Sequence, residues 1–202
     1  MDELAVLRIV AVKGRVAAAE VADSLGLDVS DVGRLGDRLV ADGAFKETLR
    51  GWRLSEDGRA RAAEALDRER AGIDHDALAA AYDEFCVLNG ELKQIVTDWQ
   101  LRDGVPNDHA DTGYDSGVLA RLGDLHRRAR PLVGRVGEIA PWTARYVARF
   151  DRADREIAAG DTAWVARPIM DSYHTVWFEL HEDLIGLLGL TRSEEAAAGR
   201  AH

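Results

Sequence analysis

The stretch that decides the fold of the first third of the chain is residues 16–58, VAAAEVADSLGLDVSDVGRLGDRLVADGAFKETLRGWRLSEDG. Its pattern predicts two helices separated by a short turn. In the first, residues 16–25, apolar side chains recur at helical spacing, and Gly26 ends the helix. In the second, Asp28 or Ser30 is a suitable N-cap. The inward stripe of this second helix is Val32, Leu35, Leu39 and Val40.

A two-stranded hairpin is predicted directly after the second helix, which ends at Gly43. Residues 45–54 are a short alternating stretch with Gly51 at its tip, as in two strands joined by a tight turn. Ser55 begins a further helix that continues to Arg70, and residues 4–12 predict a helix that precedes the others. The order of elements is that of a winged helix-turn-helix.

This segment resembles the winged-helix domain of the MarR-like bacterial transcription regulators. The resemblance is carried by residues 39–43, the hairpin and the run Leu54-Ser55-Glu56-Asp57-Gly58-Arg59, and it covers roughly the first third of the chain. In that family the second helix of the motif enters the major groove of double-stranded DNA, and the wing contacts the backbone or the minor groove. The resemblance implies such contacts for Ser30, Arg34, Arg38, Lys46, Arg50 and Arg53.

The charge of the segment leaves a second function open. Residues 1–70 carry 12 basic and 14 acidic residues, whereas DNA binding needs local positive charge. Asp31 and Asp37 lie on the outer face of the second helix, and Gly33 and Gly36 lie inside it, each costing about 1 kcal/mol relative to alanine. The alternative is a protein-interaction module that no longer binds DNA. We favour DNA binding because five basic side chains gather on the two elements that would touch DNA.

Composition indicates a cytoplasmic protein. A single cysteine, Cys86, excludes an internal disulfide. The first residues are acidic where a signal peptide would be basic, and charges interrupt every apolar run well short of a membrane span. We therefore expect no membrane association.

A domain boundary is expected at residues 71–74, which gives domains 1–72 and 73–202. The second domain carries most of the net charge of −10, so it is not the expected nucleic-acid surface. Four helices are predicted in it: about 76–99, about 118–136, one that opens at Pro141 and ends near Gly160, and one that opens at Pro168. The expected fold is all-α with a small β wing, in which a winged helix-turn-helix precedes an antiparallel four-helix bundle.

Polar residues flank the apolar stripes of the first and fourth of these helices. Buried polar groups need partners, so such a cluster on facing helices indicates either a satisfied hydrogen-bond network or a small-molecule pocket. An inward Lys93 would need a negative partner, and the sequence offers no obvious inward acid, so a carboxylate-bearing effector is the expected ligand. The candidate ligand-binding residues are Asn89, Lys93, Gln100, His174, Trp177 and His181.

A metal site is the next alternative. Asp171 and His174 lie one turn apart, and His109 lies in a loop beside Asp108 and Asp111. The domain order is similar to that of GntR-class regulators whose all-helical effector domain holds a metal, but their motif is not matched. His174 and His181 are two turns apart, about 10 Å along the helix axis, which is too far to share one ion. Asp171 also falls off the apolar face. We expect no metal and no cofactor.

An enzyme is the remaining class. The chain has no phosphate-binding glycine loop, no serine elbow and no HExxH motif. The carboxylates of Glu179, Glu182 and Asp183 are expected to form a solvated face. The predicted function is therefore a ligand-responsive, DNA-binding transcription regulator without catalytic activity. A homodimer is expected, because a two-fold pair doubles the base contacts at half-sites about 34 Å apart.

Overall fold

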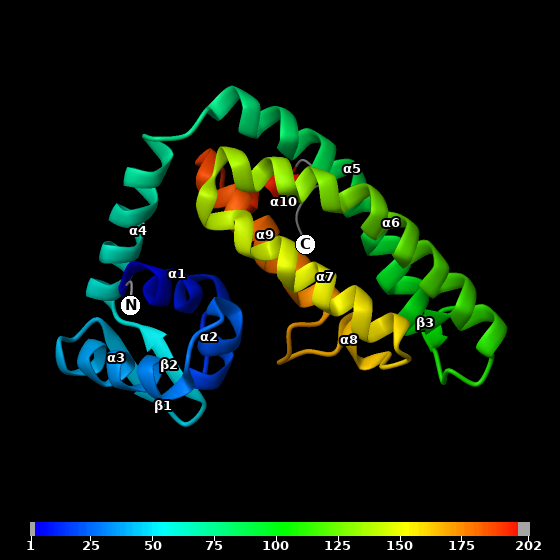
Figure 1. Ribbon diagram of the computed structural model, residues 1–202, viewed down its shortest axis with the longest axis horizontal. Helices are drawn as coiled ribbons and strands as arrows, with labels where there is room; N and C mark the ends of the chain where they lie inside the picture. The colour runs from blue at the N-terminus through cyan, green and yellow to red at the C-terminus, as the bar shows by residue number, and fades with distance from the viewer. Residues whose placement is uncertain (1–2, 198–202) are drawn as a thin grey trace. The chain divides into compact units, whose positions relative to one another are not determined.

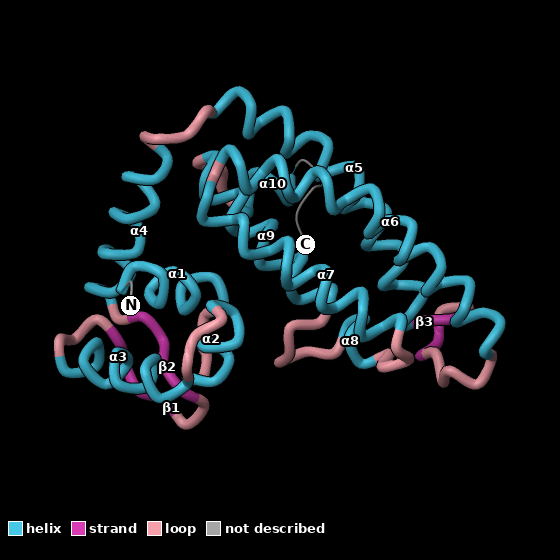
Figure 2. The backbone as a smooth tube through the Cα atoms, in the orientation of Figure 1, coloured by secondary structure: helices cyan, strands magenta, loops and turns pink. Residues whose placement is uncertain are grey.

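The chain forms two compact units, Met1–Gly72 and Ile73–His202, and the computed structural model describes residues 3–197. The division falls where the sequence analysis placed a domain boundary. Most of the described chain is helical, and strands occur only in two short hairpins within residues 3–197 (Figure 2).

The first unit contains four helices and one hairpin (Figure 1). Local capping explains where its helices begin. Asp28 accepts from the backbone N–H groups of Ser30 and Asp31, and Ser55 accepts from the N–H of Gly58. Gly26 ends the second helix with a left-handed φ of 65°. The elements are α1 Glu3–Lys13, α2 Ala18–Leu25, α3 Val29–Ala41, β1 Phe45–Thr48, β2 Gly51–Leu54 and α4 Glu56–Arg70.

Trp52 of β2 links the hairpin to α3 and to the segment before α2. Its ring lies next to that of Phe45, tilted by 30° at a centroid distance of 5.6 Å. A Cβ atom added at Gly36 of α3 would lie 1.9 Å from the Trp52 ring, so α3 can approach the hairpin this closely only with a glycine there. The expectation that a helix begins at Val16 was wrong. Val16 instead pairs with Trp52 through two backbone hydrogen bonds of 3.0 and 2.8 Å, and α2 begins at Ala18.

The second unit contains four long helices, α5, α6, α7 and α9. Helix α5 packs against α6 and α9, and α7 packs against the same two helices. A buried aromatic cluster lies among them, in which Phe85 stacks on Trp177 at 4.7 Å and Phe150 contacts Tyr173 at 5.0 Å. The elements are α5 His75–Gln100, β3 Leu101–Arg102, β4 Val105–Pro106, α6 Thr112–Ile139, the 3₁₀ helix η1 Pro141–Ala144, α7 Arg145–Ala158, α8 Ala163–Ala166, α9 Tyr173–Leu188 and α10 Arg192–Ala197.

Three features of this unit differ from the sequence-based expectation. The segment after α5, expected to be a loop, contains the small β3–β4 hairpin. Residues 141–144 form a 3₁₀ turn, and the α-helix begins only at Arg145. The last long helix begins not at Pro168 but at Tyr173, where Ser172 accepts from the N–H of Thr175 and so caps the helix. Within residues 3–197, no helix combines the length and apolar character needed to cross a membrane.

Candidate functional site

The first candidate surface is the outer face of α3. Val32, Leu35 and Leu39 are buried, whereas the three predicted DNA contacts of this helix, Ser30, Arg34 and Arg38, are exposed. The hydroxyl of Ser30 donates to Asp28 at 2.6 Å, and this contact is the main reason that the pKa of Asp28 lies below its usual value. Arg34 pairs with Asp31. Both members of that pair are well exposed, so the pair contributes little to stability and can be exchanged for another partner.

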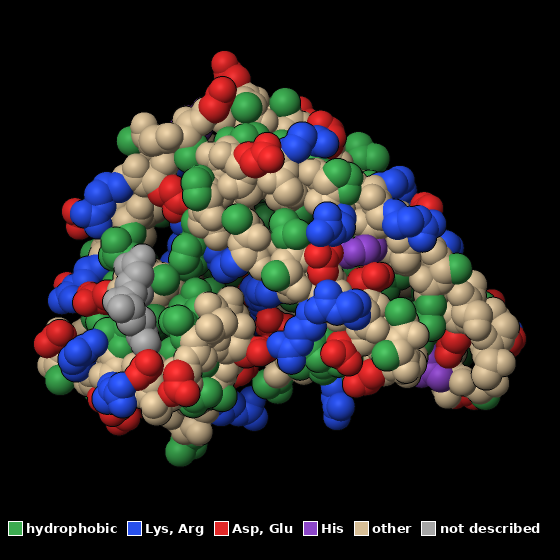
Figure 3. Space-filling model, viewed as in Figure 1, with side chains coloured by type: hydrophobic (Ala, Val, Ile, Leu, Met, Phe, Trp, Pro, Cys, Tyr) green, Lys and Arg blue, Asp and Glu red, His purple; other side chains and the backbone are tan. Residues whose placement is uncertain are grey.

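The β1–β2 hairpin carries the other three predicted DNA contacts. Lys46 and Arg53 lie opposite each other in the strand register, and Arg50 lies in the tight turn. All three are exposed. Leu49, next to Arg50, is fully exposed. On the face drawn in Figure 3, basic and acidic side chains are interspersed.

The second candidate surface is a pocket of about 190 Å³ between α5 and α9. The structure brings all six predicted ligand-binding residues to it, together with Leu92, Val96, Thr97, Phe178 and Glu182. The floor is held by hydrogen bonds: Trp177 donates from Nε1 to Asn89 Oδ1 at 3.0 Å, and His181 Nε2 lies 3.0 Å from the hydroxyl of buried Tyr82. His174 and Gln100 are exposed, so the pocket opens to solvent.

Buried carboxylates lie elsewhere in this unit, contrary to the expectation of a solvated face. Glu179 and Asp183 are only 2% and 3% exposed. The guanidinium of Arg149 donates to both oxygens of Asp171 at 2.7 Å and to Glu179 at 2.7 Å. Burial lowers the pKa of Arg149, but its contacts with Asp171 and Glu179 raise it more, so this arginine stays charged. Asp171, expected off the apolar face, is therefore buried as part of an ion-pair cluster.

Asp183 is the centre of a second buried polar cluster. Its carboxylate accepts from the indole of Trp142 at 3.0 Å, from Arg145 at 2.8 Å and from the hydroxyl of Tyr146 at 2.6 Å. Burial, followed by the nearby charge of Asp183, raises the pKa of Tyr146. Burial likewise raises the pKa of Tyr82 and of Tyr173.

These acids correct one step of the sequence-based argument. The expectation that the helices offer no inward acid was wrong, and Glu182 lines the same pocket as Lys93. The need for a negative partner therefore no longer points to a carboxylate-bearing ligand in this pocket. The polar lining still fits a small hydrogen-bonding molecule.

The residues weighed as metal ligands have other partners. Asp171 binds Arg149, and His109 lies 2.9 Å from Asp115 rather than beside Asp108 or Asp111. Among residues 3–197, no group of three or more His, Cys, Asp or Glu side chains is arranged to hold a metal ion.

Comparison with protein-family models, with curated proteins and with solved structures finds no match to this chain. The resemblance to MarR-like regulators therefore remains an expectation, and the functional argument depends on the residues themselves. Sequence reasoning missed Tyr82 and Arg149, and it placed Asp183 on a solvated face. The buried polar contacts of these three side chains join residues distant in the chain. The one available signal was the apolar spacing of α9, which places Glu179 and Asp183 beside Val176 and Leu180.

Proposed function

We propose that the chain is a ligand-responsive transcription regulator whose first unit is a winged helix-turn-helix that binds double-stranded DNA. The observation that carries the proposal is the joint exposure of the basic side chains of α3 and of the hairpin, on elements whose other faces form the core. A helix with two outward arginines, followed by a short hairpin with three basic residues, matches the parts that read base edges and contact phosphates in this class of domain.

The first unit can supply local positive charge despite its acidic composition. Arg34 has Asp31 as its partner, but an exposed pair of this kind contributes about 1 kcal/mol or less. A phosphate or a guanine edge can replace Asp31 at little cost. Lys46 and Arg53 repel each other across the strands, and a phosphate between them would relieve that repulsion.

The effector proposal depends on the pocket between α5 and α9. Its volume of about 190 Å³ is below the roughly 300–1,000 Å³ typical of sites for drug-sized ligands, so we propose a small polar effector. We also propose a homodimer, because two recognition helices give the specificity that one helix lacks. The setting that we propose for it is the cytoplasm. Sedimentation at micromolar concentration tests the homodimer, and a monomer both with and without DNA would contradict it.

The DNA-binding proposal is tested with a fluorescently labelled duplex from the region upstream of the coding sequence, measured against a shuffled duplex of the same composition. We expect tighter binding to the first duplex. For that duplex, the logarithm of the binding constant should fall linearly with the logarithm of the salt concentration. The matched control is the triple variant Lys46→Gln, Arg50→Gln, Arg53→Gln, which should bind both duplexes more weakly with a shallower salt dependence. Equal, salt-insensitive binding of both duplexes by the unaltered chain would refute the proposal.

One observation favours the alternative, a module that binds a protein partner. Apolar side chains are exposed beside the same basic residues, with Val29 preceding Ser30 and Leu49 preceding Arg50. Such side chains favour contact with protein more than with phosphate. The double variant Val29→Ser, Leu49→Ser separates the two functions. If DNA is the partner, the affinity of this variant for DNA should stay within about twofold of that of the unaltered chain, since neither side chain carries charge.

A further inference from the structure

A second pocket lies at the C-terminal end of α5, and it joins residues that the sequence analysis had not grouped in one site. Its volume is about 450 Å³, and it is lined by Trp99, Gln100, His109, Thr162 and Arg167 together with two alanines of α8. Gln100 also lines the pocket between α5 and α9. The two pockets therefore adjoin at one side chain but present different chemistry.

His109 is held in a fixed orientation at this pocket. Its Nδ1 lies 2.9 Å from the carboxylate of Asp115, and its ring packs on that of Trp99 at a centroid distance of 4.3 Å. The side chain of Asn107 accepts from the backbone N–H of His109 at 3.2 Å and donates to Asp115 at 2.9 Å, so one amide fixes both partners. Because Asp115 accepts from Nδ1, the remaining ring nitrogen, Nε2, is the one available for another contact, and it can donate when the ring is protonated.

The charge of the second pocket is opposite to that of the chain. The protein carries a net charge of −10, yet none of the residues from 3–197 that line this pocket is acidic. Arg167 is exposed and forms no ion pair with any residue of the described part of the chain. A guanidinium and an oriented imidazole that line the same pocket, together with an indole, provide groups for a negatively charged group attached to a flat apolar one.

We propose that this second pocket is a binding site for aromatic carboxylates, in which Arg167 and His109 bind the carboxylate and Trp99 contacts the ring. Thr162 supplies a hydroxyl at the same pocket, and Gln100 an amide. The site is distinct from the pocket between α5 and α9, and it does not depend on DNA binding by the first unit.

The test uses benzoate as the probe, added to the full chain and followed by equilibrium dialysis and by the NMR signals of the histidine rings. Benzoate should bind at millimolar or lower concentration and shift the His109 ring signal, which is assigned from its loss in His109→Gln. Arg167→Gln and His109→Gln should each weaken binding about tenfold or more, the loss expected for a hydrogen bond to a charged group. Benzamide, which keeps the ring but lacks the charge, should bind about tenfold more weakly than benzoate or worse.

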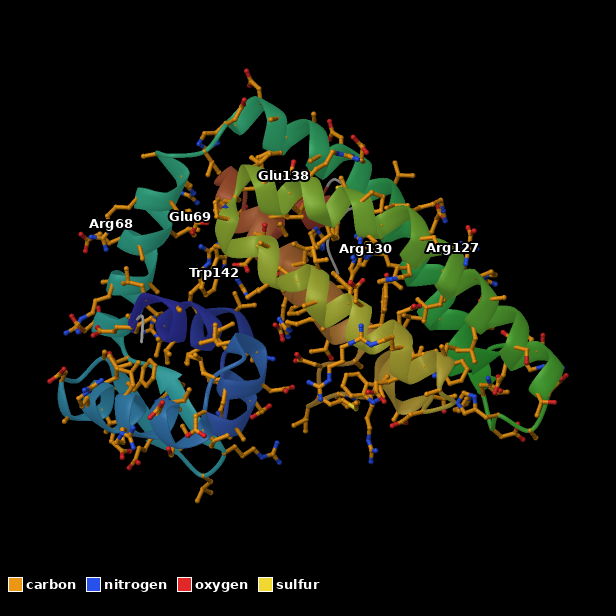
Figure 4. The ribbon with its side chains drawn as sticks, in the orientation of Figure 1. Arg68, Glu69, Arg127, Arg130, Glu138 and Trp142 are labelled. Carbon is orange, nitrogen blue, oxygen red and sulfur yellow. The ribbon has the colours of Figure 1, made fainter. Side chains whose placement is uncertain are left out.

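Two control variants locate the probe. Lys93→Gln alters the pocket between α5 and α9, and Arg127→Gln removes an exposed arginine that projects from α6 (Figure 4) and pairs only locally with Asp124. Both should leave benzoate affinity unchanged. The proposal is overturned if Lys93→Gln weakens binding while Arg167→Gln does not, if benzamide binds as tightly as benzoate, or if millimolar benzoate leaves the His109 signal in place.

Discussion

Alanine at Gly36 should destabilise the first unit, whereas alanine at Gly33, one turn earlier on α3, should stabilise it. Both changes remove a glycine from the same helix, so each gains about 1 kcal/mol of helix propensity. At Gly33 a new Cβ meets no atom within 4 Å, and that gain is kept. At Gly36 it would lie 1.9 Å from the Trp52 ring, far inside the contact distance, and forcing the ring aside costs about 1–3 kcal/mol.

The comparison of the two variants isolates this packing cost, because propensity and unfolded-state effects cancel between them. We expect the Gly36→Ala variant to be less stable than the Gly33→Ala variant by about 1–3 kcal/mol. In a unit of this size that corresponds to a difference in melting temperature of at least about 4 °C. Trp52 is the only tryptophan of residues 1–72, so its indole NMR signal reports whether the ring has moved.

The measurements are thermal unfolding and hydrogen exchange of peptides from α3 and the hairpin. Relative to the unaltered chain, the backbone amides of these peptides should exchange faster in Gly36→Ala and more slowly in Gly33→Ala. Equal stability of the two variants, with an unshifted Trp52 signal in Gly36→Ala, would show that α3 does not pack on the hairpin as described.

Three further outcomes are expected. Arg34→Ala should cost about 1–3 kcal/mol on the preferred duplex and little on random DNA, whereas Arg50→Ala should weaken both and lower the salt slope by about one; equal losses in an anisotropy titration would contradict this division of roles. Arg149→Met removes the guanidinium that two buried carboxylates bind and should cost about 3–5 kcal/mol in thermal unfolding, part of it regained at acidic pH as those carboxylates are neutralised; a loss that does not depend on pH would argue against burial of charge. Burial raises the pKa of three of the four tyrosines, so their contribution to stability is fully present below the unfolded value of about 10 and is lost above it. In an alkaline titration, the absorbance of tyrosinate should therefore rise by no more than the amount expected for one tyrosine until the protein unfolds.

Apolar spacing and capping residues predicted most of the helices, since both are local properties of the chain. Ser55 and Gly26 mark helix ends that the structure also has. Polar side chains on one flank of a stripe predicted which residues meet between α5 and α9, because helical periodicity fixes direction as well as face.

Burial of charge was not predictable in the same way. The apolar spacing of α9 places Glu179 and Asp183 beside core residues, but their partners are not visible in the sequence: only the packing of α7 on α9 brings Arg149 and Arg145 to them. The second pocket was missed for a related reason: Arg167 lies some sixty residues from His109, and only the tertiary fold brings them to one cavity. Helix starts after proline were also misplaced, because Ser172 rather than Pro168 supplies the cap.

The contacts of Trp52 have a consequence for the energetics of recognition. Its ring fills the space left by Gly36, and its backbone pairs with Val16, so the hairpin is fastened to α3 on one side and to the segment before α2 on the other. A surface already held in its binding shape loses little conformational freedom when a partner arrives. Whatever binds α3 and the hairpin therefore meets a preorganised surface. The two elements lose their conformational entropy when the chain folds, so this loss does not weaken binding.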